Sequence, residues 1–384
     1  MAADRPRSPY LLVEWSGGGG LGHYAFLLAD ALARARPDVT LITRAGYELS
    51  GVPRAHQVET AWRAAPAWKR GRARSAVVGV TRVAGWFHVC RAVLRHRGSR
   101  PVVHLQSIDR SPEIVFGAVL RLLGADVVVT LHNAVPHDSG RIRRAALAAA
   151  LRIPRGFIAH SAAVRTEIER HRGDRVPVRV LPHPTYRRLA EVGDDGREIH
   201  RGAQLRIGAI GMIRPYKGLD FVVKVLDRLV GGEPPVEFRV VGRTGDPAGV
   251  EALLARLPAD RVSRRLEYVS LPDLVHEIRS SDLLLLGHRS ASESGIAQLA
   301  LGAGVPVIGP RMGALATLLA SQDGWLYQPG DVEDALRAAR AVLDPLSRDR
   351  DALRAAALAV ADDAPGWDEM AREALALVEE TRAR

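Results

Sequence analysis

Short apolar runs alternate with longer stretches rich in Ala, Leu and Arg along almost the whole chain. Strands that alternate with helices pair in parallel, because each helix carries the chain back across a face of the sheet. The strands expected in the first half are Tyr10–Val13, Val39–Thr43, Val102–Leu105, Val127–Leu131, Gly156–Ala159 and Val178–Leu181. Those expected in the second half are Leu205–Ile210, Glu237–Val241, Leu266–Val269, Leu283–Leu286 and Val305–Ile308. The alternation predicts an α/β protein with parallel sheets.

The chain of 384 residues is long enough for two such domains, each with its own core. We expect a first domain over residues 1–185, a charged linker over 186–204 and a second domain over 205–366. Residues 332–346 and 367–384 have the composition of helices, and the second of these could cross back to the first domain. Two doubly wound domains facing each other would leave a cleft at the carboxyl ends of both sheets, where ligands bind in such folds.

Composition excludes several classes of protein. A hydrophobic fraction of 47% and a charged fraction of 25% are typical of a soluble globular chain. Cys90 is the only cysteine, which excludes an intrachain disulfide and a cysteine-based zinc site. No segment approaches the roughly 20 apolar residues of a membrane span, and the run Leu11–Val13 is too short for a signal peptide. We therefore expect a cytoplasmic protein, peripheral at most on the inner face of the plasma membrane.

The formal charge of +11 is unevenly distributed. No acidic residue lies between Glu59 and Asp109, whereas that interval holds many arginines and the aromatic residues Trp62, Trp68, Trp86 and Phe87. Cationic side chains beside aromatic ones suit an anionic membrane surface, which we expect residues 60–108 to contact. The alternative is a solvated helical face whose aromatic residues lie in the core. Nucleic acid is not expected as a partner, because no helix-turn-helix, RNP or zinc-finger pattern accompanies the charge.

Two segments of the second half place anion-binding groups where a strand or loop meets a helix. In GAIGMIRPYKG (208–218), a strand ends at Gly211 and is followed by Arg214 and Lys217. In SESGIAQLALGAGVPVIG (292–309), Ser294 and Gly295 open an apolar helix. The two cations and the free backbone N–H groups could neutralise a diphosphate. Glu293 could bind sugar hydroxyls, or could be an ordinary carboxylate at a helix start.

A glycine-rich segment follows the first expected strand. It includes Gly19, Gly20 and Gly22, reaches His23, and precedes an expected helix over Tyr24–Ala35. A dinucleotide site would require an acidic residue after the second strand, but the sequence there is TRAG (43–46). The segment is therefore expected to be either a flexible loop or a loop that closes over a substrate phosphate or sugar.

Three histidines stand at the ends of consecutive expected strands, namely His132, His160 and His183. Each could be structural, but three at adjacent strand ends favour at least one that lines a site. Their spacing matches no zinc motif, so neither a protein-bound metal nor another cofactor is expected.

These motifs together resemble the GT-B glycosyltransferases of the large family 4. The resemblance covers most of the chain and includes TLH (130–132), HS (160–161), LPHP (181–184), VVG (240–242), SDL (281–283) and, as the most specific piece, GVPVI (304–308). It implies a metal-independent hexosyltransferase with a nucleotide-sugar donor, GDP- or UDP-linked, and a glycan, polyprenyl-linked or small-molecule acceptor. The implied subgroup is the exopolysaccharide and glycolipid type.

The resemblance also implies residue roles. It places the donor diphosphate on Arg214, Lys217, Ser294 and Gly295, with Glu293, Gly211, Ser270 and Leu271 around the sugar and nucleotide. The acceptor would approach on the amino-terminal side, near the catalytic candidates His23 and His132, with His160 and His183 beside them.

Two positions depart from the family pattern. Leu299 replaces the second glutamate of the donor loop, and Met212 replaces the arginine that usually follows the strand glycine. Retaining stereochemistry is therefore not implied. Two other functions stay open: a GT-B nucleotide-sugar epimerase, and a non-catalytic partner that binds sugar nucleotides or a membrane surface.

Overall fold

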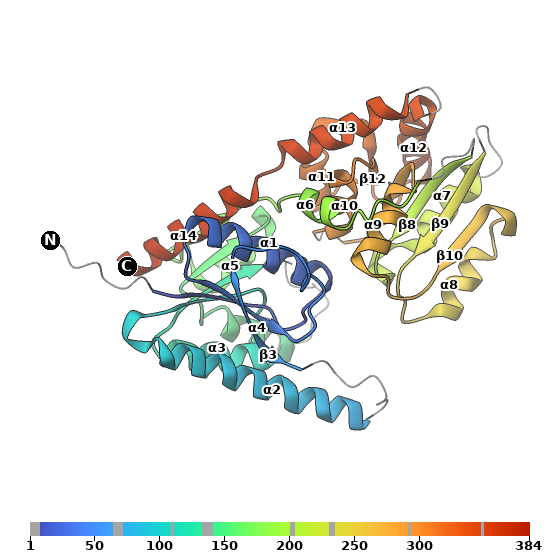
Figure 1. Ribbon diagram of the computed structural model, residues 1–384. Coiled ribbons are helices and arrows are strands. Elements are labelled where there is room, and N and C mark those ends of the chain that lie inside the picture. The colour runs from blue at the N-terminus through green and yellow to red at the C-terminus, as the bar shows by residue number, and fades with distance from the viewer. Residues whose placement is uncertain are drawn as a thin grey trace. The chain divides into compact units, whose positions relative to one another are not determined.

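The computed structural model describes residues 8–63, 72–108, 111–132, 141–199, 204–229, 235–290, 293–346 and 349–384. The chain forms two compact units (Figure 1). One comprises Met1–Pro182 together with Gly366–Arg384, and the other comprises His183–Pro365. Each unit contains one parallel sheet with helices packed on it, as the alternation of the sequence predicts.

The sheet of the first unit has seven strands in the order β3-β2-β1-β4-β5-β6-β7. They are β1 (Tyr10–Val13), β2 (Val39–Arg44), β3 (Gln57–Trp62), β4 (Val102–Leu105), β5 (Asp126–Leu131), β6 (Gly156–Ala159) and β7 (Val178–Val180). Helices α1 (Gly19–Ala35) and α14 (Trp367–Ala383) cover one face (Figure 1). Helices α2 (Arg72–Arg95), α3 (Ser111–Leu122) and α4 (Arg141–Ala150) cover the other, and α5 (Ala162–Arg172) follows β6.

The last helix of the chain is an integral part of the first unit. Gly156 on β6 allows α14 to approach closely, because a Cβ there would lie 2.8 Å from Thr381 Cγ2. The buried carboxylate of Asp126 accepts a hydrogen bond from Arg382 Nε at 2.7 Å. The expectation that residues 367–384 form a helix is confirmed, and that helix packs on α1 and on the sheet.

The sheet of the second unit has six strands in the order β10-β9-β8-β11-β12-β13. They are β8 (Leu205–Ile210), β9 (Val236–Val241), β10 (Val262–Arg265), β11 (Leu283–Leu285), β12 (Val307–Pro310) and β13 (Leu326–Tyr327). The helices are α6 (Arg187–Val192), α7 (Leu219–Leu229), α8 (Pro247–Leu254), α9 (Leu271–Arg279), α10 (Gly295–Gly302), α11 (Gly313–Leu318), α12 (Val332–Leu346) and α13 (Arg350–Asp363). Among the described residues, no helix has the length and apolar character needed to cross a bilayer.

The strand predictions are wrong or missing at three edge strands, β3, β10 and β13. The expected strand Leu266–Val269 is wrong, because β10 consists instead of the polar residues 262–265. β3 and β13 were not expected at all. The side chains of β3 and β10 are mostly only partly buried, so these strands lack an apolar run, whereas β13 is buried but only two residues long. Ser263 Oγ, for example, donates to Glu237 Oε1 at 2.9 Å.

Two further segments differ from expectation. The first helix begins at Gly19 rather than Tyr24, so His23 lies within the helix. The segment expected as a linker contains α6, which packs against α10: a Cβ on Gly302 would lie 2.7 Å from the Cα of Arg187. The acceptor and donor roles assigned to the two domains stay predictions.

All strands run parallel, and the order in which they are added reverses between β1 and β4 in the first unit and between β8 and β11 in the second. The loops that follow two such strands turn to opposite faces, which opens a crevice at their carboxyl ends. In the second unit the backbones meet closely there. A Cβ on Gly242, where φ is +143°, would lie 1.9 Å from the carbonyl oxygen of Gly211. A Cβ on Gly218 would lie 2.0 Å from the carbonyl oxygen of Gly287.

We expect Gly242→Ala to lower the free energy of unfolding by roughly 2–5 kcal/mol, because it adds backbone strain and a clash with buried backbone. Gly245→Ala is the matched control, since nothing lies within 4 Å of its added Cβ. Urea denaturation of both variants measures the difference. Equal stability of the two variants would contradict the close packing described here.

Candidate functional site

The switch point of the second unit brings together two of the predicted donor-site residues, Gly211 and Lys217. Gly211 ends β8 with φ of +102°, and a Cβ placed on it would be 3.6 Å from Lys217 Nζ and 3.5 Å from Ile296 Cγ1. The ammonium group of Lys217 and the side chain of Ile296, in the first turn of α10, therefore both border the end of β8. The same pocket is lined by residues that follow β11, Gly287 and His288.

The ammonium of Lys217 is the dominant charge of this pocket. The side chain is half-buried, and burial lowers the pKa of Lys217 to about 8. Burial and the charge of Lys217 together lower the pKa of His288 to about 4, so its imidazole is neutral at neutral pH. Within the described part of the chain, Lys217 forms no ion pair. A half-buried ammonium without an ion pair favours an anionic ligand, because a negative charge beside it would offset the free-energy cost of removing the ammonium from water.

Helix α10 supplies a second anion-binding feature beside Lys217. Ser294 caps the helix, and its Oγ accepts a hydrogen bond from the N–H of Ala297 at 3.4 Å. The backbone N–H groups of Gly295 and Ile296 belong to the first turn, where helix amides lack intrahelical acceptors. Burial raises the pKa of Glu293 to about 8, which keeps much of this carboxyl protonated near neutral pH. Leu299 is buried, so the replaced glutamate position lies in the packed part of the helix.

Arg214 and Lys217 differ sharply in their surroundings. Arg214 is exposed, and its Nε lies 3.1 Å from Met212 Sδ. Tyr216, between them in sequence, stacks on His288 with ring centroids 6.0 Å apart. Lys217 is thus held by packing and Arg214 is not. The predicted diphosphate role of Arg214 stays a prediction.

Ser270 and Leu271 have identifiable local roles. Ser270 caps α9, accepting a hydrogen bond from the N–H of Asp273 at 3.4 Å. Leu271 is buried, and a Cβ placed on Gly193 would be 3.2 Å from its Cγ. Their predicted contact with the nucleotide stays a prediction.

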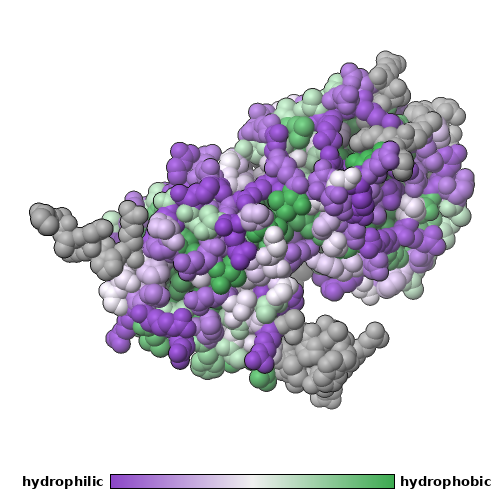
Figure 2. All heavy atoms as spheres, in the orientation of Figure 1, coloured by the Kyte–Doolittle hydropathy of each residue, from purple (hydrophilic) through white to green (hydrophobic). Residues whose placement is uncertain are grey.

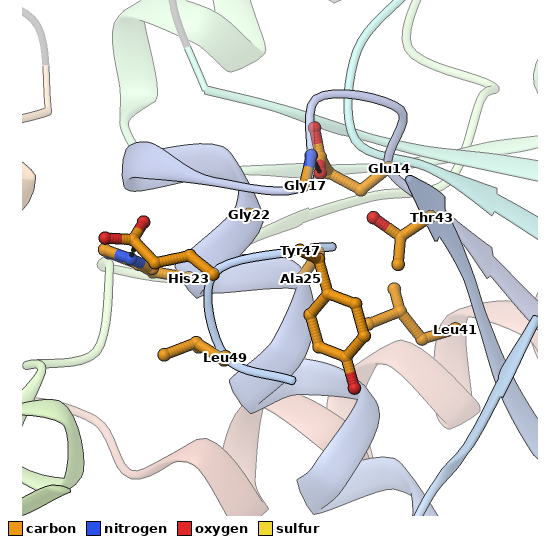
Figure 3. A pocket seen from close by; sticks show the side chains of 10 residues that line it. Glu14, Gly17, Gly22, His23, Ala25, Leu41, Thr43, Tyr47 and Leu49 are labelled. Atoms are coloured by element: carbon orange, nitrogen blue, oxygen red, sulfur yellow. Dashed lines mark hydrogen bonds and ion pairs between the residues drawn. The ribbon is translucent and has the colours of Figure 1, made fainter. Parts of the chain in front are cut away.

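In the first unit, the glycine-rich segment is held by a buried carboxylate that the sequence reasoning did not single out. Glu14 accepts hydrogen bonds from the N–H of Ser16 at 2.8 Å and from the N–H of Gly17 at 2.7 Å (Figure 3). Gly22 lies against this turn, since its added Cβ would be 3.1 Å from the carbonyl carbon of Gly17. Gly19 and Gly20 have open space around them and form the first turn of α1. The segment is thus a loop braced by Glu14 that leads directly into a helix.

His23 projects from the first turns of α1 into a small pocket that also contains Glu14, Gly17 and Tyr47 (Figure 3). Its Nε2 lies 2.9 Å from Glu48 Oε2, and its side chain is 6% exposed. Glu48 follows β2 in the loop after Tyr47, and it also accepts a hydrogen bond from the N–H of Gly19 at 3.2 Å.

His132 and His160 lie together against the same helix. The ring of Tyr24 contacts His132 at 4.6 Å and His160 at 5.2 Å between centroids, and Trp367 of α14 at 5.2 Å. His132 Nε2 lies 3.3 Å from Gln106 Oε1 in the loop after β4. His160 donates from Nδ1 to the carbonyl of Leu181 at 2.8 Å, and burial lowers its pKa to about 4.

His183 belongs to the second compact unit, separate from the other two strand-end histidines. Its Nδ1 donates to the carbonyl oxygen of Pro184 at 2.6 Å, and Tyr186 stacks edge-on against its ring at 5.2 Å. Its predicted place on the acceptor side stays a prediction. Over the described ranges, no group of three or more His, Cys, Asp or Glu side chains is arranged to hold a metal ion.

Comparison with known proteins identifies the second unit. The family described as "Glycosyl transferases group 1" matches residues 204–345. Residues 204–345 are a group 1 glycosyltransferase domain. This stretch contains β8 to α12, and with them Gly211, Lys217 and α10.

Two kinds of curated relative support this assignment. A GDP-mannose:glycolipid 4-beta-D-mannosyltransferase of Xanthomonas campestris pv. campestris is 29% identical over 226 residues, 56% of this chain and 60% of the relative. A D-inositol 3-phosphate glycosyltransferase of Jonesia denitrificans is 30% identical over 179 residues, 45% of this chain and 42% of the relative. The chain thus spans at most about 60% of the length of these curated relatives.

Solved structures match nearly the whole chain. Anabaena HepE in complex with UDP and glucose has a TM-score of 0.71 at 17% identity, covering 96% of this chain and 100% of that one. Sucrose-phosphate synthase from Thermosynechococcus elongatus has a TM-score of 0.73 at 18% identity, covering 98% and 100%. Both likenesses concern the fold, which is GT-B.

We expect the amine of Lys217 to be acylated by a small water-soluble reagent with a midpoint near pH 8. Its pKa of about 8 makes its neutral fraction near neutral pH much larger than that of an ordinary lysine, whose pKa is about 10.4. The chain has only three lysines, and Lys224, exposed on α7, provides an internal comparison. Mass spectrometry of peptides labelled at a series of pH values measures both. A Lys217 midpoint no lower than that of Lys224 would contradict the buried environment.

Proposed function

We propose that the chain transfers a sugar from a GDP- or UDP-linked donor to a hydroxyl of a glycan or lipid-linked acceptor. The observation that carries the proposal is the half-buried ammonium of Lys217, without an ion pair among the described residues, beside the first turn of α10. A nucleoside diphosphate would supply the missing negative charge. The group 1 glycosyltransferase domain and the glycolipid mannosyltransferase relatives support the same donor chemistry.

The transfer step needs stabilisation of the leaving nucleoside diphosphate. Negative charge builds on the diphosphate as its bond to the sugar carbon breaks, and a cation fixed beside it lowers the barrier. In our proposal Lys217 and the N–H groups of Gly295 and Ile296 provide this stabilisation. Glu293, protonated near neutral pH, could donate a hydrogen bond to the sugar. The step requires no metal if these groups carry the charge.

We infer that the first unit binds the acceptor. His23, His132 and Gln106 follow β1, β5 and β4, on either side of its switch point, the usual place for a ligand in such a sheet. The glycolipid specificity named for the Xanthomonas relative favours a lipid-linked sugar over a free one. The same relatives, named as transferases, favour transfer over epimerisation.

The donor proposal is tested by Lys217→Ala. Loss of a charge-assisted contact to phosphate is expected to weaken binding of GDP or UDP by about tenfold to a hundredfold. Lys224→Ala is the control, because Lys224 is exposed on α7, in the same unit. Isothermal titration of both variants with the nucleotide that the wild-type chain binds gives the comparison. Equal dissociation constants for Lys217→Ala and Lys224→Ala would contradict the proposed site.

We further propose that α2 and α3 rest on an anionic membrane surface that carries the acceptor. Helix α2 exposes Val80, Val83, Phe87 and Leu94, spaced so as to share one face, with Arg91 on the same face. The ring centroids of Phe87 and of Phe116 on α3 are 5.6 Å apart, and α3 also exposes Val115 and Leu122. Figure 2 shows hydrophobic residues among hydrophilic ones along the lower edge of the first unit, where Figure 1 places these helices.

The basic side chains around this face favour acidic lipids. Arg91 and Arg97 are exposed and have no ion pair with any described residue, whereas Arg82 is paired with Glu113. Trp68 lies outside the described residues, and the other three aromatic residues named for the segment divide between the two alternatives that the sequence left open. Trp62 and Trp86 are buried and pack edge to face, with ring centroids 5.6 Å apart. Phe87, in contrast, is 64% exposed.

We expect the double variant Phe87→Ser, Leu94→Ser to reduce flotation with phosphatidylglycerol-containing vesicles by at least about fivefold, since each buried apolar side chain contributes roughly 1.5–3 kcal/mol. Val192→Ser, an exposed apolar position of the second unit, is the control. Wild-type flotation that is absent, or unchanged in the double variant, would contradict a membrane-bound α2.

A further inference from the structure

A second cavity of the second unit lies away from the Lys217 pocket. Its volume is about 440 Å³, within the range of roughly 300–1,000 Å³ that small-molecule sites occupy. Its walls are residues 281–282, residues 304–306 and the first turns of α13, and we call it the α13 cavity. Residues 281–282 directly precede β11 and residues 304–306 directly precede β12. The α13 cavity therefore lies at the amino ends of these strands, whereas Lys217 lies at the carboxyl ends.

Two sequence motifs that the donor site does not use form part of the α13 cavity. SDL (281–283) leads into β11, and GVPVI (304–308) leads into β12. Asp282 is buried, and its carboxylate accepts a hydrogen bond from the N–H of Arg206 at 2.8 Å. The same carboxylate forms an ion pair with Arg350, with Nε and Oδ1 3.3 Å apart. Arg350 thus has a structural role, because this ion pair joins the start of α13 to the start of β11.

Arg354, one turn further along α13, is the cation of the cavity without such a partner. It is half-buried, and it forms no hydrogen bond or ion pair with any residue that the structure describes. A Cβ placed on Gly304, where φ is +75°, would be 2.8 Å from Arg354 Cγ and 3.3 Å from its Cζ, so the glycine leaves the room that this side chain occupies.

The charge of Arg354 also affects a neighbouring arginine. Burial and the charge of Arg354 together lower the pKa of Arg279, which is itself paired with Asp194. Asp194 thus has its own cationic partner, and no described carboxylate is paired with Arg354. The α13 cavity therefore contains a positive charge that a ligand could neutralise.

We propose that the α13 cavity binds a sugar phosphate through Arg354, at a site separate from the donor pocket. A guanidinium without an ion pair suits a phosphate group, because its planar fork of N–H groups can form two parallel hydrogen bonds to phosphate oxygens. Arg354 contacts the phosphate, and the remaining walls contact the sugar.

Those walls restrict the class of ligand. Asp351 is exposed and lines the cavity, so its carboxylate repels a second anionic group and can accept hydrogen bonds from sugar hydroxyls. Leu353, Val305 and Pro306 provide apolar contact for the C–H groups of a sugar ring. None of the described residues that line the cavity is aromatic, so nothing there would stack on a nucleobase. The walls therefore favour a sugar with one phosphate over a nucleotide.

Binding of glucose 6-phosphate to the full chain, measured by isothermal titration, tests the proposal. We expect Arg354→Ala to weaken binding about tenfold to a hundredfold, the usual loss for a charge-assisted contact to phosphate. Arg340→Ala is the matched control, because Arg340 is an exposed arginine of α12 without an ion pair to any described residue. Asp351→Asn should strengthen binding about twofold to fivefold, since it removes a negative charge from beside the phosphate.

Two further measurements show where the probe binds. Hydrogen exchange should slow in peptides that cover residues 304–306 and 350–354 when glucose 6-phosphate is added. Lys217→Ala should bind glucose 6-phosphate as the wild type does, because Lys217 lies at the other end of the strands. This comparison keeps the α13 cavity distinct from the donor site, whose own test uses the same variant with GDP or UDP. If Arg354→Ala fails to fold, Arg354→Gln replaces it.

Binding that is weakened in Arg354→Ala, strengthened in Asp351→Asn and unchanged in Lys217→Ala supports the proposal. A wild-type chain that does not bind glucose 6-phosphate overturns it, and so do equal affinities in Arg354→Ala and Arg340→Ala. Loss of binding in Lys217→Ala would assign the phosphate to the donor pocket and overturn the separate site. Inorganic phosphate bound as tightly as glucose 6-phosphate would overturn the sugar as part of the ligand.

Discussion

A positive charge partly removed from water, without an ion pair among the described residues, is the feature on which the proposed donor site depends. Burial lowers the pKa of Lys217 to about 8, which measures the cost of holding that ammonium in place. The ammonium of Lys217 lies at the carboxyl ends of β8 and β11, where the strand order reverses. A ligand with two phosphates would offset the desolvation and bind more tightly for that reason. In our proposal, stability and donor binding are therefore linked through the side chain of Lys217.

Backbone packing makes this arrangement possible. Gly211 and Gly242 meet where β8 and β9 end, and Gly218 and Gly287 meet beside the turn that carries Lys217. At each contact a side chain would collide with a carbonyl oxygen. A similar but less tight glycine contact occurs in the first unit, where Gly22 packs against the turn that is hydrogen-bonded to Glu14. In both units, glycines allow the loops after the central strands to pack closely against neighbouring backbone.

The sequence predicts most of the core and little of the periphery. Buried parallel strands such as β4, β6 and β8 are continuous apolar runs, so their bounds follow directly from the sequence. The edge strands β3 and β10 are polar and mostly only partly buried, so no apolar run marks them in the sequence. In the proposed site, Lys217 and Ser294 are predicted from their places, Lys217 after a strand and Ser294 at the start of a helix. Glu48 is not, because it lies 25 residues from His23 in a loop with no motif of its own.

The central claim is that Lys217 and the first turn of α10 hold the donor diphosphate. A crystal structure of the chain with bound GDP or UDP tests it most directly. The account predicts phosphate oxygens within hydrogen-bonding distance, about 3 Å, of Lys217 Nζ and of the backbone N–H groups of Gly295 or Ile296. A diphosphate bound away from the ends of β8 and β11, with the ammonium making no contact to it, would contradict the account.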